Sequence, residues 1–151
     1  MQWTKNDVSI YTAEKEYVDT AFIPLVPFDP TSDRTMEKEA FQNEVNQVFG
    51  QLLEKEFKGR IMLSPVYHYL TGRQEEETER LNQWVEAFKQ QPFEHVFLFT
   101  FDPKWKKWEQ QLTGQLIWIP GLSSGNLQST ETRSFLKEQV SQVSDLIQAY
   151  W

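Results

Sequence analysis

The hydrophobic residues recur in two patterns, short apolar runs and longer stretches with helical spacing, and the two patterns alternate along the chain. The clearest run is residues 95–101, His-Val-Phe-Leu-Phe-Thr-Phe, which lies between Pro92 and the pair Asp102-Pro103. A strand that is apolar on both faces is typical of the centre of a sheet covered by helices on each side. We therefore predict that residues 95–101 form a central strand around which the fold is arranged.

Three other apolar runs predict strands, and helical spacing of apolar residues predicts helices between them. The strands are predicted at residues 18–26, 60–64, 95–101 and 115–119. A short first helix is predicted to begin at Thr4. Further helices are predicted over residues 35–57, 103–112 and 130–150. Another helix is predicted to begin at the capping pair Thr71 and Gln74 and to end at Pro92. Residues 66–70 are interpreted either as an aromatic loop or as a continuation of the second strand.

This alternation predicts an α/β fold, specifically a three-layer α/β/α sandwich in a single domain over residues 1–151. The sheet is expected to be mainly parallel and four-stranded, with strand order 2-1-3-4. The link between the last two strands, residues 102–114, barely reaches the about 10–12 residues that a crossover requires. An antiparallel last strand is therefore retained as an alternative.

Composition narrows the classes of function. The formal net charge of -7 opposes binding to phosphate backbones, so we expect no nucleic-acid partner. The absence of cysteine excludes disulfides, thiol catalysis and Cys-ligated metal sites, and it fits a reducing compartment. No apolar run approaches the about 20 residues of a membrane-spanning helix, and the first residues contain no apolar signal core. We expect a cytoplasmic protein.

Two aspartates are the first candidates for chemistry. In an open α/β sheet, ligands bind beyond the carboxyl ends of the strands where the winding reverses, here between the first and third strands. Both strands end in Phe-Asp-Pro, at residues 28–30 and 101–103. Asp29 and Asp102 could thus face each other and hold a divalent cation or share a proton. The alternative, which we favour, is that each aspartate caps a turn or helix with proline at the next position.

Two further residues could join such a site. His68 lies just past the second strand and could be a general base or metal ligand, although a partly buried hydrogen-bonding role is commoner. Ser124 lies in the small-residue loop 123–126, which could cradle an anion but matches no phosphate-binding spacing. With Asp29 and Asp102, these residues define an alternative function, a small metal- or phosphate-handling hydrolase. The sequence does not identify a cofactor for either function.

The densest basic and aromatic cluster is Lys104-Trp105-Lys106-Lys107-Trp108. Tryptophan next to lysine suits a protein interface, or weak attachment to an anionic membrane surface. Alternatively, Trp105 and Trp108 pack into the core while Lys104 and Lys107 remain in solvent. Our leading hypothesis is a non-catalytic interaction or regulatory module that contacts another protein through this helix.

The first part of the chain resembles a known family. The matching positions are Trp3, Asp7, Tyr11 and residues 15–21 (Lys-Glu-Tyr-Val-Asp-Thr-Ala) and 23–27 (Ile-Pro-Leu-Val-Pro). They are similar to the opening of the YpiF-like family of small, uncharacterised proteins from Bacillus-type Gram-positive bacteria. The resemblance implies a soluble cytoplasmic protein of unknown function. It carries over no active-site residue, cofactor or partner.

Overall fold

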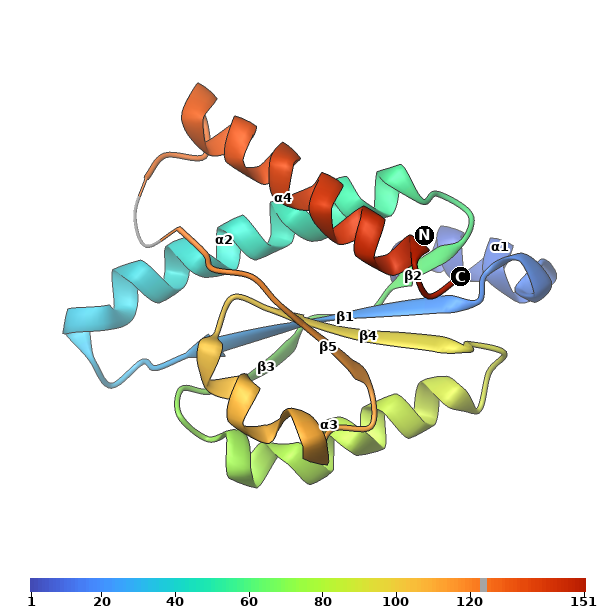
Figure 1. Ribbon diagram of the computed structural model, residues 1–151, viewed down its shortest axis with the longest axis horizontal. Helices are drawn as coiled ribbons and strands as arrows, with labels where there is room; N and C mark the ends of the chain where they lie inside the picture. The colour runs from blue at the N-terminus through green and yellow to red at the C-terminus, as the bar shows by residue number, and fades with distance from the viewer. Residues whose placement is uncertain (123–124) are drawn as a thin grey trace.

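The computed structural model describes residues 1–122 and 125–151 and contains a five-stranded sheet between two layers of helices (Figure 1). The elements in chain order are α1 (Lys5–Ala13), η1 (Lys15–Tyr17), β1 (Thr20–Phe28), α2 (Asp33–Glu56), β2 (Ile61–Leu63), β3 (Tyr67–Leu70), α3 (Gln74–Lys89), β4 (His95–Thr100), η2 (Pro103–Gln111), β5 (Gln115–Trp118) and α4 (Thr130–Gln148). Helices α2 and α4 cover one face of the sheet, and α3 with the 3₁₀-helix η2 covers the other (Figure 1). The predicted α/β class and its three layers are confirmed.

The sheet pairs its strands in parallel, in the order β2-β1-β4-β5. The fifth strand, β3, pairs with the carboxyl half of β1, while β2 pairs with the amino half. The sheet thus has five strands instead of the predicted four, because Pro65 interrupts the second strand and residues 67–70 resume it. The antiparallel alternative for the last strand is wrong, since β5 runs parallel to β4.

The short link to β5 suffices because it is not an α-helix. The nine residues of η2 form a 3₁₀-helix, which rises about 2.0 Å per residue compared with about 1.5 Å in an α-helix. The segment therefore spans roughly 18 Å instead of roughly 14 Å. Asp102 caps η2, its Oδ1 accepting from the backbone N–H of Lys104 at 3.0 Å, and Pro103 occupies the first helical turn.

The predicted central strand is confirmed, because β4 lies between β1 and β5 and is buried from Val96 to Thr100. Phe99 stacks on Phe49 of α2, with ring centroids 4.2 Å apart, and on Phe22 of β1 at 5.4 Å. Leu98 belongs to the core on the opposite face, with α3 and η2. Helices on both faces are therefore needed to exclude solvent from this strand.

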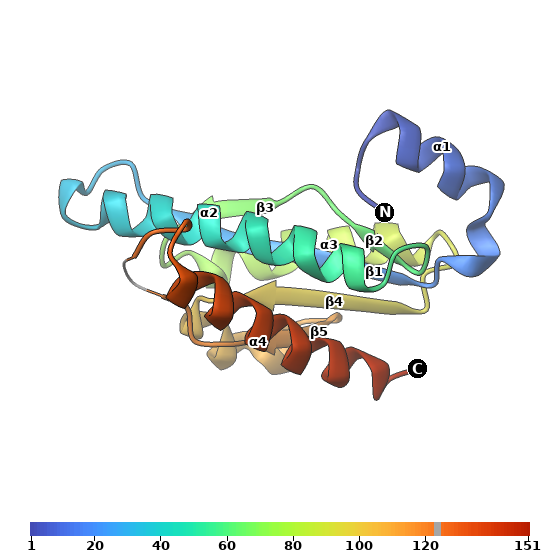
Figure 2. The same cartoon turned by 90° about the horizontal axis from the view of Figure 1, so that it is seen from above.

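Helix α2 extends past the end of the sheet (Figure 2). Its first turns lie beyond the carboxyl end of β1, so Met36 is 40% exposed even though helical spacing places it on the apolar side. From Val45 onward the same stripe is buried against the sheet. In the described part of the chain, no helix is both long and apolar enough to cross a membrane.

At the amino edge of the sheet, one arginine connects three segments. The Arg60 guanidinium donates to both carboxylate oxygens of Asp19, at 3.2 and 3.1 Å, and lies 3.5 Å from the ring centroid of Trp151. The Trp151 indole N–H donates to Thr20 Oγ1 at 2.9 Å. Burial raises the pKa of Asp19, but the hydrogen bonds from Arg60 and Thr20 outweigh burial and leave the pKa below its ordinary value. This cluster ties β1, β2 and the last residues together.

We predict that Arg60→Met lowers the free energy of unfolding by about 1 kcal/mol at neutral pH, because it removes a partly solvent-screened ion pair and a cation–π contact. Because the pKa of Asp19 is lowered in the folded state, this stabilisation is present above about pH 4 and is lost as the pH falls through the folded pKa. Urea unfolding at several pH values measures both effects. Arg34→Met, at an exposed position, is the matched control, and equal losses in the two variants would contradict the prediction.

Candidate functional site

The candidate site is a cavity of about 430 Å³ at the carboxyl edge of the sheet, which we call the carboxyl-edge cavity. It lies where β1 and β4 run side by side, with β2 and β3 on one flank and β5 on the other, which is the switch point of this topology. Its lining residues are Leu25, Val26, Pro27, Thr35, Lys38, Glu39, Gln42, Asn46, Thr71, Phe101, Asp102, Pro103, Lys104, Trp118, Pro120 and Gly121.

Polar side chains without partners converge on this cavity. Asn46 of α2 is 2% exposed, and within residues 1–122 and 125–151 neither Nδ2 nor Oδ1 of its amide has a hydrogen-bond partner. The same holds, in those residues, for Trp118 Nε1 and Gln42 Oε1. Buried polar groups are nearly always paired, and each one left unpaired costs about 1–3 kcal/mol. The cavity therefore has hydrogen-bonding capacity that the described protein groups do not use.

The walls around these polar groups are largely apolar. Leu25 and Val26 come from β1, and Phe101 and Trp118 follow from β4 and β5. Gly121 closes one side, and a Cβ added there would lie 2.6 Å from Gln42 Oε1 and 3.0 Å from Phe101 Cβ. Only glycine lets the loop approach this closely without a clash. An apolar cavity with a few convergent polar groups is typical of a small-molecule site.

Asp102 lines the cavity and also belongs to a hydrogen-bond network with residues of β3, α3 and η2. Its Oδ2 accepts from Tyr69 Oη and from Gln74 Nε2, each at 2.7 Å, and Tyr69 Oη accepts from the indole N–H of Trp105 at 2.8 Å. Burial, assisted by the Asp102 carboxylate, raises the pKa of the Tyr69 hydroxyl well above its ordinary value. Asp102 is thus both the cap of η2 and an acceptor that joins β3, α3 and η2.

Asp29 has a local role. Its Oδ1 accepts from the backbone N–H of Thr31 at 2.9 Å and from Thr31 Oγ1 at 2.5 Å, and these hydrogen bonds lower the pKa of the Asp29 carboxyl. Asp29 lines a second cavity of about 210 Å³ together with His68, whereas Asp102 lines the carboxyl-edge cavity. The two aspartates adopt the turn and cap roles that we favoured, and they do not share a cavity.

Of the other predicted catalytic residues, His68 does not line the carboxyl-edge cavity. His68 is exposed on β3, with its ring centroid 6.1 Å from that of Phe28. Ser124 lies outside the described residues. Among the described residues, no group of three or more His, Asp or Glu side chains is arranged to hold a metal ion. Among the three predicted catalytic residues that the structure describes, His68 and Asp29 line one cavity and Asp102 lines the other.

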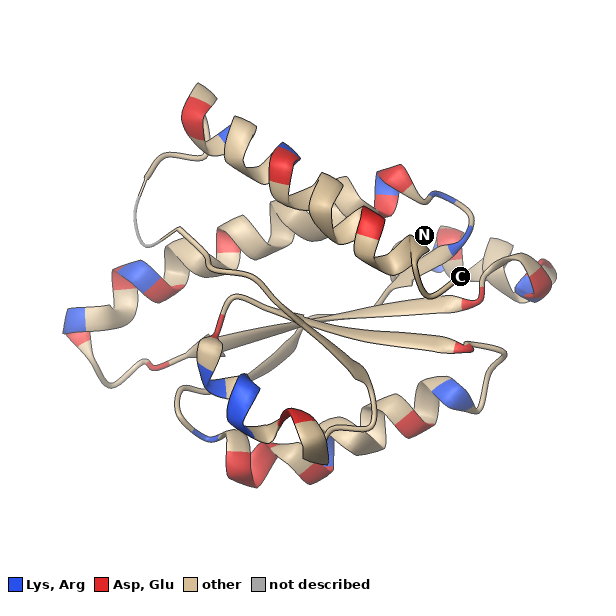
Figure 3. Cartoon of the chain, in the orientation of Figure 1, with Lys and Arg blue, Asp and Glu red and all other residues tan. Residues whose placement is uncertain are grey.

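Of the two alternatives for Trp105, an exposed contact surface on η2 and packing into the core, the structure shows the second. The Trp105 side chain is fully buried, because η2 packs it against Tyr69 of the sheet. Trp108 is half-buried against the same core, while Lys104 and Lys107 are exposed. Of the predicted interface residues, only the two lysines are freely accessible. Figure 3 shows basic residues on η2 and on the first turns of α2, at the carboxyl edge of the sheet.

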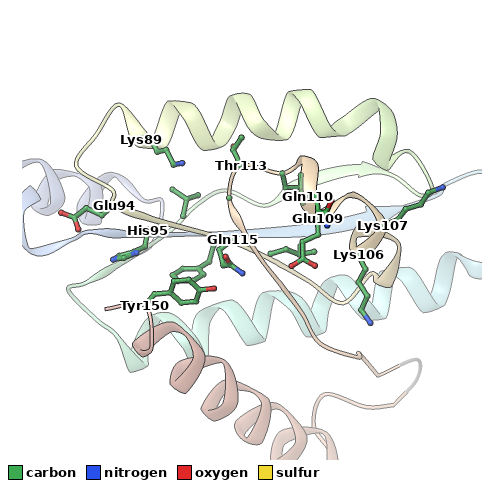
Figure 4. A pocket seen from close by; sticks show the side chains of 15 residues that line it. Lys89, Glu94, His95, Lys106, Lys107, Glu109, Gln110, Thr113, Gln115 and Tyr150 are labelled. Atoms are coloured by element: carbon green, nitrogen blue, oxygen red, sulfur yellow. The ribbon is translucent and has the colours of Figure 1, made fainter.

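A larger groove, of about 940 Å³, lies between η2 and the first residues of β4 and β5 (Figure 4). Its charged side chains do not converge, because Lys106 and Lys107 lie at one end and Glu94 and His95 at the other (Figure 4). The carboxyl-edge cavity is smaller but collects buried polar groups that lack partners in the described part of the chain. We therefore take the carboxyl-edge cavity as the candidate site.

The sequence did contain a signal for Asn46. It occupies a position on the stripe that includes Phe49 and Leu53, and a polar residue among buried apolar neighbours marks a hydrogen-bonding site.

Thr71 and Gln74, in contrast, were expected to cap α3. Their side chains instead donate to Glu39 and Asp102, and the structure shows no side-chain cap on Arg73 at the start of α3.

Comparison with known proteins agrees with the resemblance noted in the sequence. Residues 9–151 match the family described as "Protein of unknown function (DUF2487)". The chain is 28% identical to the uncharacterized protein YpiF of Bacillus subtilis (strain 168) over 151 residues, which are all of this chain and 98% of that protein. No solved structure matches the chain.

For the network around Asp102, we expect Tyr69→Phe to lower the free energy of unfolding by about 1–3 kcal/mol, because Trp105 Nε1 loses its buried acceptor and Asp102 loses a donor. Chemical denaturation at neutral pH measures the loss. Tyr150→Phe, at a side chain 44% exposed, makes the same chemical change on the surface. A loss no larger than that of the control would show that the network does not stabilise the fold.

The same hydroxyl predicts a dependence on alkaline pH. The raised pKa keeps Tyr69 protonated in the folded state, whereas the unfolded state releases this proton above about pH 10. The stabilisation is therefore complete below about pH 10 and is lost above it, by up to about 1.4 kcal/mol per pH unit. Unfolding between about pH 9 and pH 11 should show a shallower decline for Tyr69→Phe than for the natural protein. Parallel declines would refute this assignment.

Proposed function

The chain belongs to the DUF2487 family, whose description assigns no function, and we propose that it is a non-catalytic regulatory module that binds a small molecule in the carboxyl-edge cavity. One observation carries the proposal. Asn46 is buried at the cavity with both amide groups unpaired among the described residues. A bound molecule would supply the missing partners.

The energetic cost of Asn46 supports a binding role. An apolar residue of the same shape would avoid the cost of two unpaired buried groups, about 1–3 kcal/mol each. Stability is therefore a poor reason for asparagine at this position, whereas a binding site commonly sacrifices stability for recognition. The position of the cavity at the switch point of the sheet, where α/β proteins bind ligands, favours the same conclusion.

The acidic residues of the cavity support binding over catalysis. Asp102 already accepts hydrogen bonds from Tyr69 and Gln74. Glu39 accepts from the backbone N–H of Asp29 at 2.8 Å and from the Thr71 hydroxyl. Their oxygens are directed at protein donors, so the groups left for a ligand are amides, an indole N–H and ammonium groups. These groups hold and orient a molecule, and α2, η2 and the segment after β5 would all contact it.

We expect Asn46→Leu to abolish ligand binding while leaving the free energy of unfolding unchanged or higher by about 1 kcal/mol, since leucine has the shape of asparagine without its polar atoms. A thermal-shift screen of a metabolite library against both proteins, followed by calorimetric titration of the hits, measures binding. Asn43→Leu is the matched control, because Asn43 lies one helical turn away and lines the smaller cavity.

Two outcomes would overturn the proposed function. One is a screen in which no compound stabilises the natural protein more than it stabilises Asn46→Leu. The other is a loss of more than about 2 kcal/mol in the free energy of unfolding of Asn46→Leu, which would assign Asn46 a structural role. Binding that persists in Asn43→Leu and disappears in Asn46→Leu would locate the ligand in the carboxyl-edge cavity.

A further inference from the structure

We infer that the molecule bound in the carboxyl-edge cavity is a planar heteroaromatic anion with an amide-like donor and acceptor edge. The inference rests on the proposed function and specifies its ligand class. It follows from three properties of the cavity, namely the pairing capacity of Asn46, the aromatic and proline residues of the lining and the two exposed lysines that also line it.

The edge is inferred from Asn46. A side-chain amide offers a donor and an acceptor side by side, which matches a ring edge that presents an acceptor next to an N–H. Both groups of Asn46 are free of partners in the part of the chain that the structure describes. Trp118 Nε1 adds one donor and Gln42 Oε1 adds one acceptor, and these two atoms also lack partners among the described residues. A purely apolar ligand would leave all four groups unpaired.

The planar shape is inferred from the walls. Phe101 and Trp118 contribute aromatic rings to the lining, and Pro27, Pro103 and Pro120 contribute rigid apolar rings. Lys106 Nζ lies 3.4 Å from the ring centroid of Trp118 and covers part of that indole. A volume of about 430 Å³ is near the lower end for ligand sites, so it suits one ring or two fused rings and not a dinucleotide.

The negative charge is inferred from Lys38 and Lys104. Both are exposed cavity-lining residues, and neither forms an ion pair within residues 1–122 and 125–151. The carboxylates of Glu39 and Asp102 instead accept hydrogen bonds from protein donors, so the ammonium groups are the charges free to meet a ligand. The net charge of -7 does not prevent this, because salt screens charges beyond about 8 Å.

Orotate, uracil and benzoate test the inference with the full chain. Orotate has the ring edge and a carboxylate, uracil has the edge alone, and benzoate has the carboxylate on a ring without the edge. In NMR titrations we expect orotate to bind at least about tenfold more tightly than either of the others. Uridine monophosphate, titrated in parallel, distinguishes an anionic carboxylate from an anionic phosphate as the preferred group.

Variants assign each part of the ligand. The double variant Lys38→Gln, Lys104→Gln should weaken orotate about tenfold and leave uracil unchanged, while Asn46→Leu should weaken both and leave benzoate unchanged. Lys107→Gln, exposed on η2 but absent from the cavity, is the control. Because the lysines are exposed, these variants should fold normally.

Equal affinities for orotate and uracil, no effect of the lysine double variant, or binding of orotate that survives Asn46→Leu would each overturn the inference. The proposed function would still hold if the library screen finds a neutral compound whose binding depends on Asn46. If no compound shows that dependence, the proposed function fails as well. The two failures are therefore distinguishable.

Discussion

The structure depends on the burial of β4 on both faces. A strand whose residues from Val96 to Thr100 are all inaccessible needs helices above and below it, and α2, α4, α3 and η2 supply them. The strands of this sheet are parallel and joined by crossovers, which cover both faces and place the carboxyl ends of β1, β4 and β5 at one edge. The location of the carboxyl-edge cavity follows from this arrangement, because the segments leaving those strands form its walls.

The sequence predicted the layered fold because hydrophobic periodicity reports which faces of an element are buried. It could not distinguish a 3₁₀-helix from an α-helix over residues 103–112, since apolar residues three positions apart fit both. That difference decided whether the last strand could be parallel. For Trp105 the sequence left exposure and burial as alternatives, because its burial depends on a tyrosine more than thirty residues earlier in the chain.

The place of the candidate site was predictable, whereas its chemistry was not. Strand order indicated the carboxyl edge between β1 and β4, and the cavity lies there. Asp29 and Asp102, the acidic residues considered for this site, take the turn and cap roles that the sequence favoured, as the hydrogen bonds to their carboxylates show. Asn46 and Trp118, whose groups lack partners in the described part of the chain, come from α2 and β5 and meet only after folding.

The several roles of Asp102 affect how mutational data on this family should be interpreted. One carboxylate caps η2, accepts from Tyr69 and Gln74, and also lines the cavity. A mutational scan scored by ligand binding alone would rank Asp102 beside the proposed binding residue Asn46, although we expect substitution of Asp102 to act through loss of folded protein. Scoring protein abundance alongside function separates these two positions, and positions where substitution reduces function at constant abundance test the proposed binding surface.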